Sequence, residues 1–136
     1  MLTGKKILLV DDDPDILTSM HAAFEPTGAV IESASNGNKA VELAEKSHPD
    51  LIILDMMLPG RSGFLVLEKI QAEKTKAKKP RSSAPLVIMV TGNSGSRHKM
   101  YAEALGASEY FTKPVKLDKL ISTAERLLSP VAPAAT

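Results

Sequence analysis

Residues 51–60 have the sequence LIILDMMLPG, in which four apolar residues run directly into a single carboxylate, Asp55. A short, continuous apolar run of this kind is typical of a parallel strand that is buried on both faces. Pro59 and Gly60 then turn the chain. Open α/β sheets bind ligands at the carboxyl ends of their strands, so Asp55 stands where such a site would lie. An acid that merely begins a polar loop would look the same.

Similar patterns along the rest of the chain indicate four more strands and five helices. The strands are expected at Ile7–Val10, Ala29–Ser33, Leu86–Val90 and Glu109–Thr112. Helices are indicated by helical spacing of apolar residues after Pro14, around Ala40–Ala44, after Gly63, around Met100–Leu105 and over Leu117–Leu128. This alternation predicts an α/β fold of the flavodoxin-like, doubly wound type, with a five-stranded parallel sheet in the order 2-1-3-4-5 and five helices.

The composition excludes several classes of protein. A chain of 136 residues suits one domain, expected over residues 1–129, with a disordered Pro/Ala tail at residues 130–136. A net charge of +1 gives no strong field toward nucleic acid or a membrane. The absence of cysteine excludes disulfides, thiol catalysis and cysteine–zinc sites. No apolar run is long enough for a membrane span, and the run Ile7–Val10 is too short for a signal peptide, so we expect a cytoplasmic protein.

The predicted strand order brings chemically active residues from four strand ends to one edge of the sheet. These residues are Asp11 and Asp12, Asp55, Thr91 and Lys113. Three carboxylates in close proximity repel one another unless a cation is present, and their hard oxygen atoms suit Mg²⁺. A threonine hydroxyl and a lysine ammonium can both contact phosphoryl oxygens. The set predicts phosphoryl transfer with the carboxylate of Asp55 as nucleophile, although each residue taken alone has an ordinary structural explanation.

Other metal-binding patterns are not satisfied. The acids at 11, 13 and 15 resemble the start of an EF-hand loop, but Ile16 and Ala22 occupy the positions that need glycine and glutamate. Asp13 before Pro14 is better explained as a helix N-cap. The histidines are too scattered for a zinc pair and are expected to be solvated; they are His21, His48 and His98.

Four segments together resemble the receiver domains of two-component response regulators, over about residues 5–129. The segments are Ile7–Pro14, Leu54–Gly60, Val90–Gly92 and Phe111–Pro114. The resemblance implies that Asp55 accepts a phosphoryl group from a phosphohistidine on a sensor histidine kinase or a histidine phosphotransfer protein. It implies a Mg²⁺ site formed by Asp11, Asp12, Asp55 and the backbone carbonyl of Met57.

The resemblance also implies a switch. Thr91 and Lys113 would hold the phosphoryl oxygens, Tyr110 would be the switch aromatic, and the Lys113–Pro114 bond would be cis. Partners would then recognise a changed surface formed by the fourth helix, the fifth strand and the fifth helix. The expected function is a phosphorylation-activated signalling switch for a downstream protein partner, without direct DNA binding. Enzymatic activity would be limited to self-phosphorylation from a donor and slow autodephosphorylation.

Two alternatives stay open at this point. A Mg²⁺-dependent phosphohydrolase would use Asp55 as its nucleophile and turn over many substrate molecules. A degenerate receiver would act as a constitutive binding module, but every expected site residue is present. The basic segment Lys74–Pro85 could contact an acidic partner, although a solvated loop that partly extends the third helix is the favoured explanation.

Overall fold

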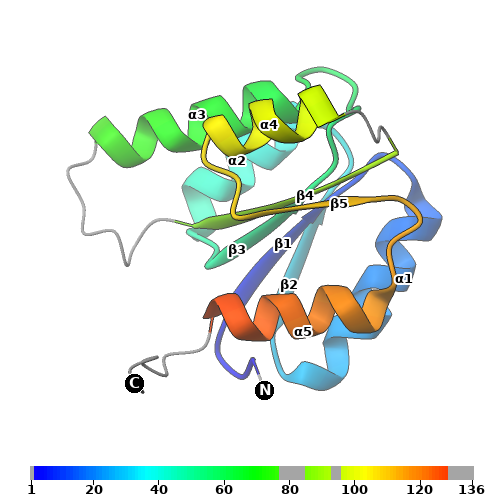
Figure 1. Ribbon diagram of the computed structural model, residues 1–136. Helices are drawn as coiled ribbons and strands as arrows, with labels where there is room; N and C mark the ends of the chain where they lie inside the picture. Colours follow the sequence, from blue (N-terminus) through cyan, green and yellow to red (C-terminus); the bar gives the residue numbers. More distant parts are fainter. Residues whose placement is uncertain (1, 77–84, 93–95, 129–136) are drawn as a thin grey trace, which may run out of the picture.

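Five parallel strands form one sheet in the part of the chain that the structure describes. The structure is a computed structural model that describes residues 2–76, 85–92 and 96–128. The strands are β1 (Lys6–Val10), β2 (Val30–Ala34), β3 (Leu51–Leu54), β4 (Leu86–Thr91) and β5 (Glu109–Thr112). They lie in the order β2-β1-β3-β4-β5, which confirms the predicted flavodoxin-like topology (Figure 1).

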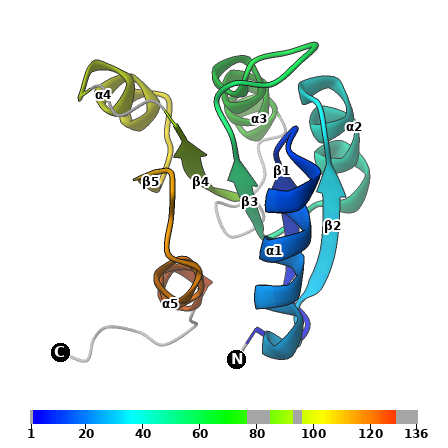
Figure 2. The same ribbon diagram turned by 90° about the vertical axis from the view of Figure 1, so that its right-hand side faces the viewer.

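Helices cover both faces of the sheet. They are α1 (Pro14–Phe24), α2 (Gly37–Ser47), α3 (Gly63–Lys76), α4 (Ser96–Ala104) and α5 (Leu117–Leu128), with a short 3-10 turn η1 (Glu25–Thr27) after α1. Figure 2 shows α1 and α5 on one face and α2, α3 and α4 on the other. This three-layer arrangement is the doubly wound architecture expected for alternating strands and helices.

The central strands are buried on both faces. In β1, Ile7 and Leu9 point into the cluster under α1 and α5, whereas Leu8 and Val10 point into the cluster under α2 and α3. All four residues of β3 are buried in the same alternating way. Because burying a polar side chain without a hydrogen-bond partner is costly, the polar side chains of a site are expected after the ends of these strands.

Capping residues set the helix boundaries. Asp13 is the N-cap of α1, and its side chain accepts a hydrogen bond from the backbone N–H of Asp15 at 2.9 Å, as the Asp-Pro pair predicted. Asn36 caps α2 in the same way through the N–H of Lys39. The end of α2 is unusual, because His48 adopts the left-handed conformation with φ of 51°.

The sequence-based boundaries differ from the observed ones in few places. Strand β2 begins at Val30, one residue later than expected, because it is an edge strand whose apolar pattern is weak. Helix α3 extends to Lys76, so the start of the basic segment Lys74–Pro85 is helical. Most of that segment, at 77–84, and the tail at 130–136 lie outside the described residues. None of the helices within the described ranges has the length and apolar character that crossing a membrane requires.

Candidate functional site

Three carboxylates lie together at the carboxyl edge of the sheet, where β1 and β3 end side by side. Oxygen atoms of Asp11, Asp12 and Asp55 all lie within 4.8 Å of one another. Asp11 and Asp55 are only 1% and 4% exposed, whereas Asp12 is open to solvent. The acids meet at the edge that the strand order predicted, and the structure shows that two of them are buried and one is accessible.

The pairing of β1 with β3 explains why these acids meet. Val10 is paired with Leu54, so the next residue of each strand, Asp11 and Asp55, emerges at the same level. The backbone N–H of Asp55 donates to the carbonyl of Val10 at 3.0 Å, which continues the ladder past the end of β3. Helix α1 leaves β1 toward one face and α3 leaves β3 toward the other, so the acids lie at the topological switch point of the sheet.

Lys113 joins the two buried acids. Its Nζ lies 2.8 Å from Oδ2 of Asp11 and 3.3 Å from Oδ2 of Asp55. The lysine follows β5, and its backbone N–H donates to the carbonyl of Thr91 at the end of β4. The bond to Pro114 is cis, as expected.

Burial and charge shift the protonation equilibria of this group. Burial, reinforced by the negative charge of Asp11, raises the pKa of Asp55, and the opposing effects of Lys113 and the Met57 N–H do not cancel the rise. For Lys113, burial lowers the pKa, but the hydrogen bond to Asp11 and the charges of both acids outweigh burial and raise it overall. Lys113 is thus held as an ammonium. The ionised form of Asp55 is disfavoured by burial and by the charge of Asp11, and a further cation would stabilise it.

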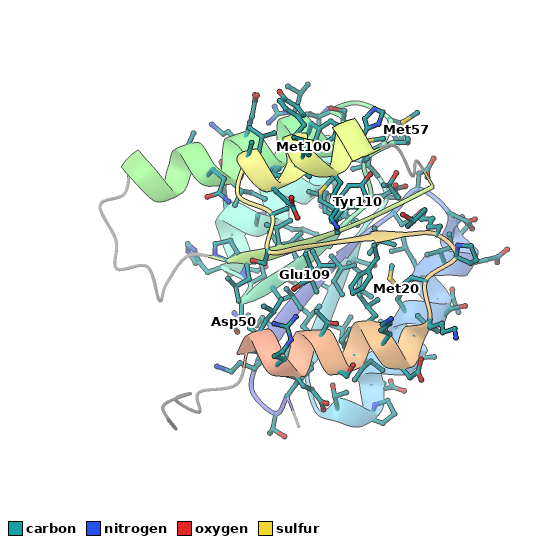
Figure 3. All side chains as sticks on the ribbon, viewed as in Figure 1. Met20, Asp50, Met57, Met100, Glu109 and Tyr110 are labelled. Carbon is teal, nitrogen blue, oxygen red and sulfur yellow. The ribbon has the colours of Figure 1, made fainter. Side chains whose placement is uncertain are left out.

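Backbone groups orient the carboxylates. The N–H of Asp13 donates to Oδ1 of Asp11 at 2.9 Å, and the N–H of Met57 donates to Oδ1 of Asp55 at a long 3.4 Å. Each buried acid therefore has one oxygen directed to backbone and the other to Lys113. The side chain of Met57 is 66% exposed and lies at the surface beside the site (Figure 3).

The other two expected residues occupy neighbouring strand ends. Thr91 is the last residue of β4 and is fully buried, one strand away from Asp55. Tyr110 in β5 is partly buried, and Figure 3 shows it between the sheet and α4. Burial raises the pKa of the Tyr110 hydroxyl. All the predicted site strands thus converge on one edge, with Tyr110 on the α4 side of it.

Gly63 was not among the predicted site residues. Its N–H donates to the carbonyl of Met56 at 2.8 Å, and a Cβ at this position would collide with the carbonyl oxygen of Asp55. Only glycine therefore lets the start of α3 pack against the backbone of Asp55. The sequence does carry a sign of this close contact, because a glycine stands directly before the apolar pattern of a helix.

The acidic cluster fits a divalent cation. When all three carboxylates are ionised, the single ammonium of Lys113 leaves two negative charges in excess among them. Closely spaced carboxylate oxygens, one of them accessible, are the hard donors that Mg²⁺ prefers, and Mg²⁺ keeps several of its waters. Asp11, Asp12 and Asp55 could therefore hold such an ion.

The fold and this site define a flavodoxin-like α/β protein with an aspartate-centred acidic cluster at its switch point. A family model for the response regulator receiver domain matches residues 7–125. The chain therefore belongs to the family of response regulator receiver domains. Members of this family act in two-component systems as signalling switches and not as classical enzymes.

Individual proteins show the same relationship. Protein PilH of Pseudomonas aeruginosa is 34% identical over 91% of this chain and 98% of its own length. The alkaline phosphatase synthesis transcriptional regulatory protein PhoP of Bacillus subtilis is 36% identical over 82% of this chain, which spans only 43% of that protein.

A solved structure gives the same result in three dimensions. The receiver domain of sensor histidine kinase PA1611 from Pseudomonas aeruginosa, with a magnesium ion coordinated in its active site cleft, has 27% sequence identity and a TM-score of 0.76. The match covers 91% of this chain and 97% of that one.

Proposed function

We propose that this chain is a phosphorylation-activated switch in which the carboxylate of Asp55 accepts a phosphoryl group from a phosphohistidine. The observation that carries the proposal is the position of Asp55, a buried carboxylate in contact with an ammonium, Lys113, and beside a second acid, Asp11. A buried acid with a raised pKa costs the folded protein free energy when it is ionised, and such groups cluster at functional sites.

In the proposed reaction an oxygen of Asp55 attacks the phosphorus atom. A P–O bond forms while the P–N bond to the donor imidazole breaks, and the imidazole leaves with the electron pair and takes up a proton. The ammonium of Lys113, already 3.3 Å from Oδ2 of Asp55, compensates negative charge on the transferred group. The hydroxyl of Thr91 then donates to a phosphoryl oxygen.

Three acids and one backbone carbonyl would hold Mg²⁺ in this reaction. These ligands are Asp11, Asp12, Asp55 and the carbonyl of Met57, with water completing the shell. When bound, the ion supplies positive charge that offsets the repulsion between the phosphoryl oxygens and the acids. The exposure of Asp12 leaves an entry path for the ion, and the PA1611 receiver domain, which carries magnesium in its cleft, supports the choice of metal.

The signal would leave the site through Thr91 and Tyr110. A phosphoryl group adds about −1.5 to −2 charges at one point, and Thr91, which lies one strand away, moves toward it. The space released under α4 would admit the ring of Tyr110 more deeply, so that the surface of α4, β5 and α5 changes for a downstream protein partner. The modification biases two arrangements that already exist.

The phosphoryl donor would be a sensor histidine kinase or a histidine phosphotransfer protein. Its phosphohistidine must reach Asp55, which is buried beside the accessible side chains of Asp12 and Met57. The donor surface would therefore cover these two residues during transfer.

Incubation with acetyl phosphate and Mg²⁺, followed by intact mass measurement, tests the proposal. The wild type should gain one phosphoryl group, and Asp55→Asn should gain none. Equal labelling of both proteins would contradict the assignment of the acceptor. Release of many phosphate molecules per protein, without a labelled species, would favour the phosphohydrolase instead.

A further inference from the structure

The first residue of α3 is fixed to the backbone of the acceptor. Gly63 donates its N–H to the carbonyl of Met56 and packs so closely on Asp55 that a Cβ would collide with the Asp55 carbonyl oxygen. The same Cβ would lie 2.7 Å from Cα of Met56. Because both neighbours are backbone atoms, a movement of the acceptor peptide toward α3 would displace Gly63.

The next residue, Phe64, continues this connection to α4. Its ring meets Tyr101 edge to face, with centroids 4.9 Å apart and planes at 74°. On the ring of His98 it stacks nearly parallel, at 5° and 6.2 Å. Both geometries are favoured for aromatic pairs. One side chain of α3 therefore holds two successive turns of α4.

Few of the described side chains of α4 are buried. Among its residues 98–104, Ala102 is the one buried side chain, while Met100 and Tyr101 are 69% and 47% exposed. Beyond its C-terminal end, the carbonyl of Gly106 accepts a hydrogen bond from Gln71 at 3.3 Å. A helix with little buried surface opens readily, so the two ring contacts of Phe64 are expected to matter for the described side chains of α4.

One ring nitrogen of His98 is buried. Within the described part of the chain, its Nδ1 is shielded from solvent and makes no hydrogen bond. The prediction that all three histidines are solvated was therefore wrong for this atom. The lost hydration of this nitrogen opposes part of the stabilisation that the ring contacts give.

We propose that Phe64 is a positioning residue that couples the acceptor to α4. The contact of Gly63 with Asp55 sets the place of the Phe64 ring, and the ring biases the position of the N-terminal half of α4. This coupling uses other residues than the path through Thr91 and Tyr110, although both reach α4. It rests on the proposed function, because the event that it transmits is the modification of Asp55.

Hydrogen exchange of the α4 amides tests the coupling. Wild type, Phe64→Leu and Phe64→Tyr are compared with and without beryllofluoride and Mg²⁺, a non-covalent substitute for the phosphoryl group. We expect free Phe64→Leu to exchange at residues 98–105 about tenfold faster than wild type, because the ring contacts are lost. In this variant, the change in α4 exchange that beryllofluoride causes should be less than about one third of the change in wild type. Phe64→Tyr retains the ring, so its free-state exchange rate and its change on adding beryllofluoride should both match those of wild type.

The controls separate coupling from folding and from the chemistry of the site. Met100→Ala removes an exposed side chain of the same helix and should keep the wild-type response. His98→Phe keeps the stack without the unpaired nitrogen, so α4 should exchange more slowly and respond less. An unchanged response in Phe64→Leu would overturn the coupling, provided that acetyl phosphate still labels the protein. Failure of wild type itself to be labelled would instead reject the proposed function, and the free-state comparison would still test whether Phe64 holds α4.

Discussion

The ammonium of Lys113 lies 2.8 Å from Oδ2 of Asp11, a residue 102 positions earlier in the chain. The same nitrogen reaches Oδ2 of Asp55 at 3.3 Å, so one cation serves two buried acids. This contact joins the end of β5 to the ends of β1 and β3. The lysine thus has a structural role in addition to its proposed part in phosphoryl transfer.

Replacing Lys113 with alanine should destabilise the protein in a pH-dependent way. Two buried carboxylates lose their shared ammonium, which should cost about 2 kcal/mol at pH 7, below the usual cost for a buried pair because Lys113 is 22% exposed. The pKa of Asp55, which is already raised, would rise further without the ammonium. Protonation of the carboxylate at lower pH should therefore remove most of the loss of stability. Urea denaturation at pH 7 and pH 4 measures the loss of stability and its reduction at lower pH. Lys116→Ala, at an exposed position, is the control, and an equal loss at both pH values would contradict the account.

The substitution Asp55→Asn should stabilise the metal-free protein at neutral pH. Burial and the charge of Asp11 raise the pKa of Asp55 above its ordinary value of 3.8, so the folded state binds the proton more tightly than the unfolded state. For such a carboxyl, stability falls as pH rises through the window above 3.8, and the neutral amide avoids this fall. We expect a gain of about 3 °C in melting temperature at pH 7 that vanishes below pH 3.8.

Calorimetry or thermal melts across pH measure this effect of Asp55→Asn. Glu103→Gln, an exposed charge removal in α4, should show no comparable gain. Added Mg²⁺ should reverse the order by stabilising wild type selectively. A gain that persists at low pH would show that charge is not its cause.

Neighbouring acids should differ sharply in their effect on metal binding. Asp12→Asn removes a carboxylate from the cluster and should weaken Mg²⁺ binding by at least about tenfold. Asp13→Asn removes the same charge one residue away, but asparagine can still cap α1, so affinity should change little. Titration calorimetry with Mg²⁺ compares the two. Equal losses would mean that general charge, and not direct ligation, governs binding.

The end of α2 offers a stability test far from the site. His48 adopts φ of 51°, a left-handed conformation that costs a non-glycine residue about 1 kcal/mol. His48→Gly should therefore stabilise the protein by about 0.5 kcal/mol after the greater freedom of the unfolded glycine chain is deducted. Glu45→Gly, inside the same helix, should destabilise by about 1 kcal/mol. Chemical denaturation measures both, and a loss in both variants would refute the conformational argument.

Prediction from the sequence succeeded where a local pattern has one physical solution. The apolar run Leu51–Leu54 can be satisfied only by burial on both faces, and this placed Asp55 as the first polar residue at the end of the strand. Prediction was less accurate at β2, an edge strand in which Val30 is 51% exposed. Partial burial leaves a weaker apolar pattern in the sequence of such a strand.

Contacts between segments were harder to foresee. Gly63 and His98 each carry a constraint that depends on a neighbour in space, namely the carbonyl of Asp55 and the ring of Phe64. Hydrophobic periodicity reports which face of an element is buried, but it does not report which backbone atoms approach within van der Waals contact. The packing of α3 on the acceptor and of α4 on α3 was therefore missed.

The amino-acid sequence by itself determined the order of strands and helices, the burial of the central strands and the kinds of side chain that follow each strand end. These properties depend on period, propensity and chain connectivity, which are local or topological. Only the tertiary structure decided that Lys113 bridges Asp11 and Asp55, that the pKa of Asp55 is raised, and that Gly63 touches its carbonyl. Coulomb and desolvation energies change steeply with distance and depth, and both are fixed only when segments distant in the chain are packed together.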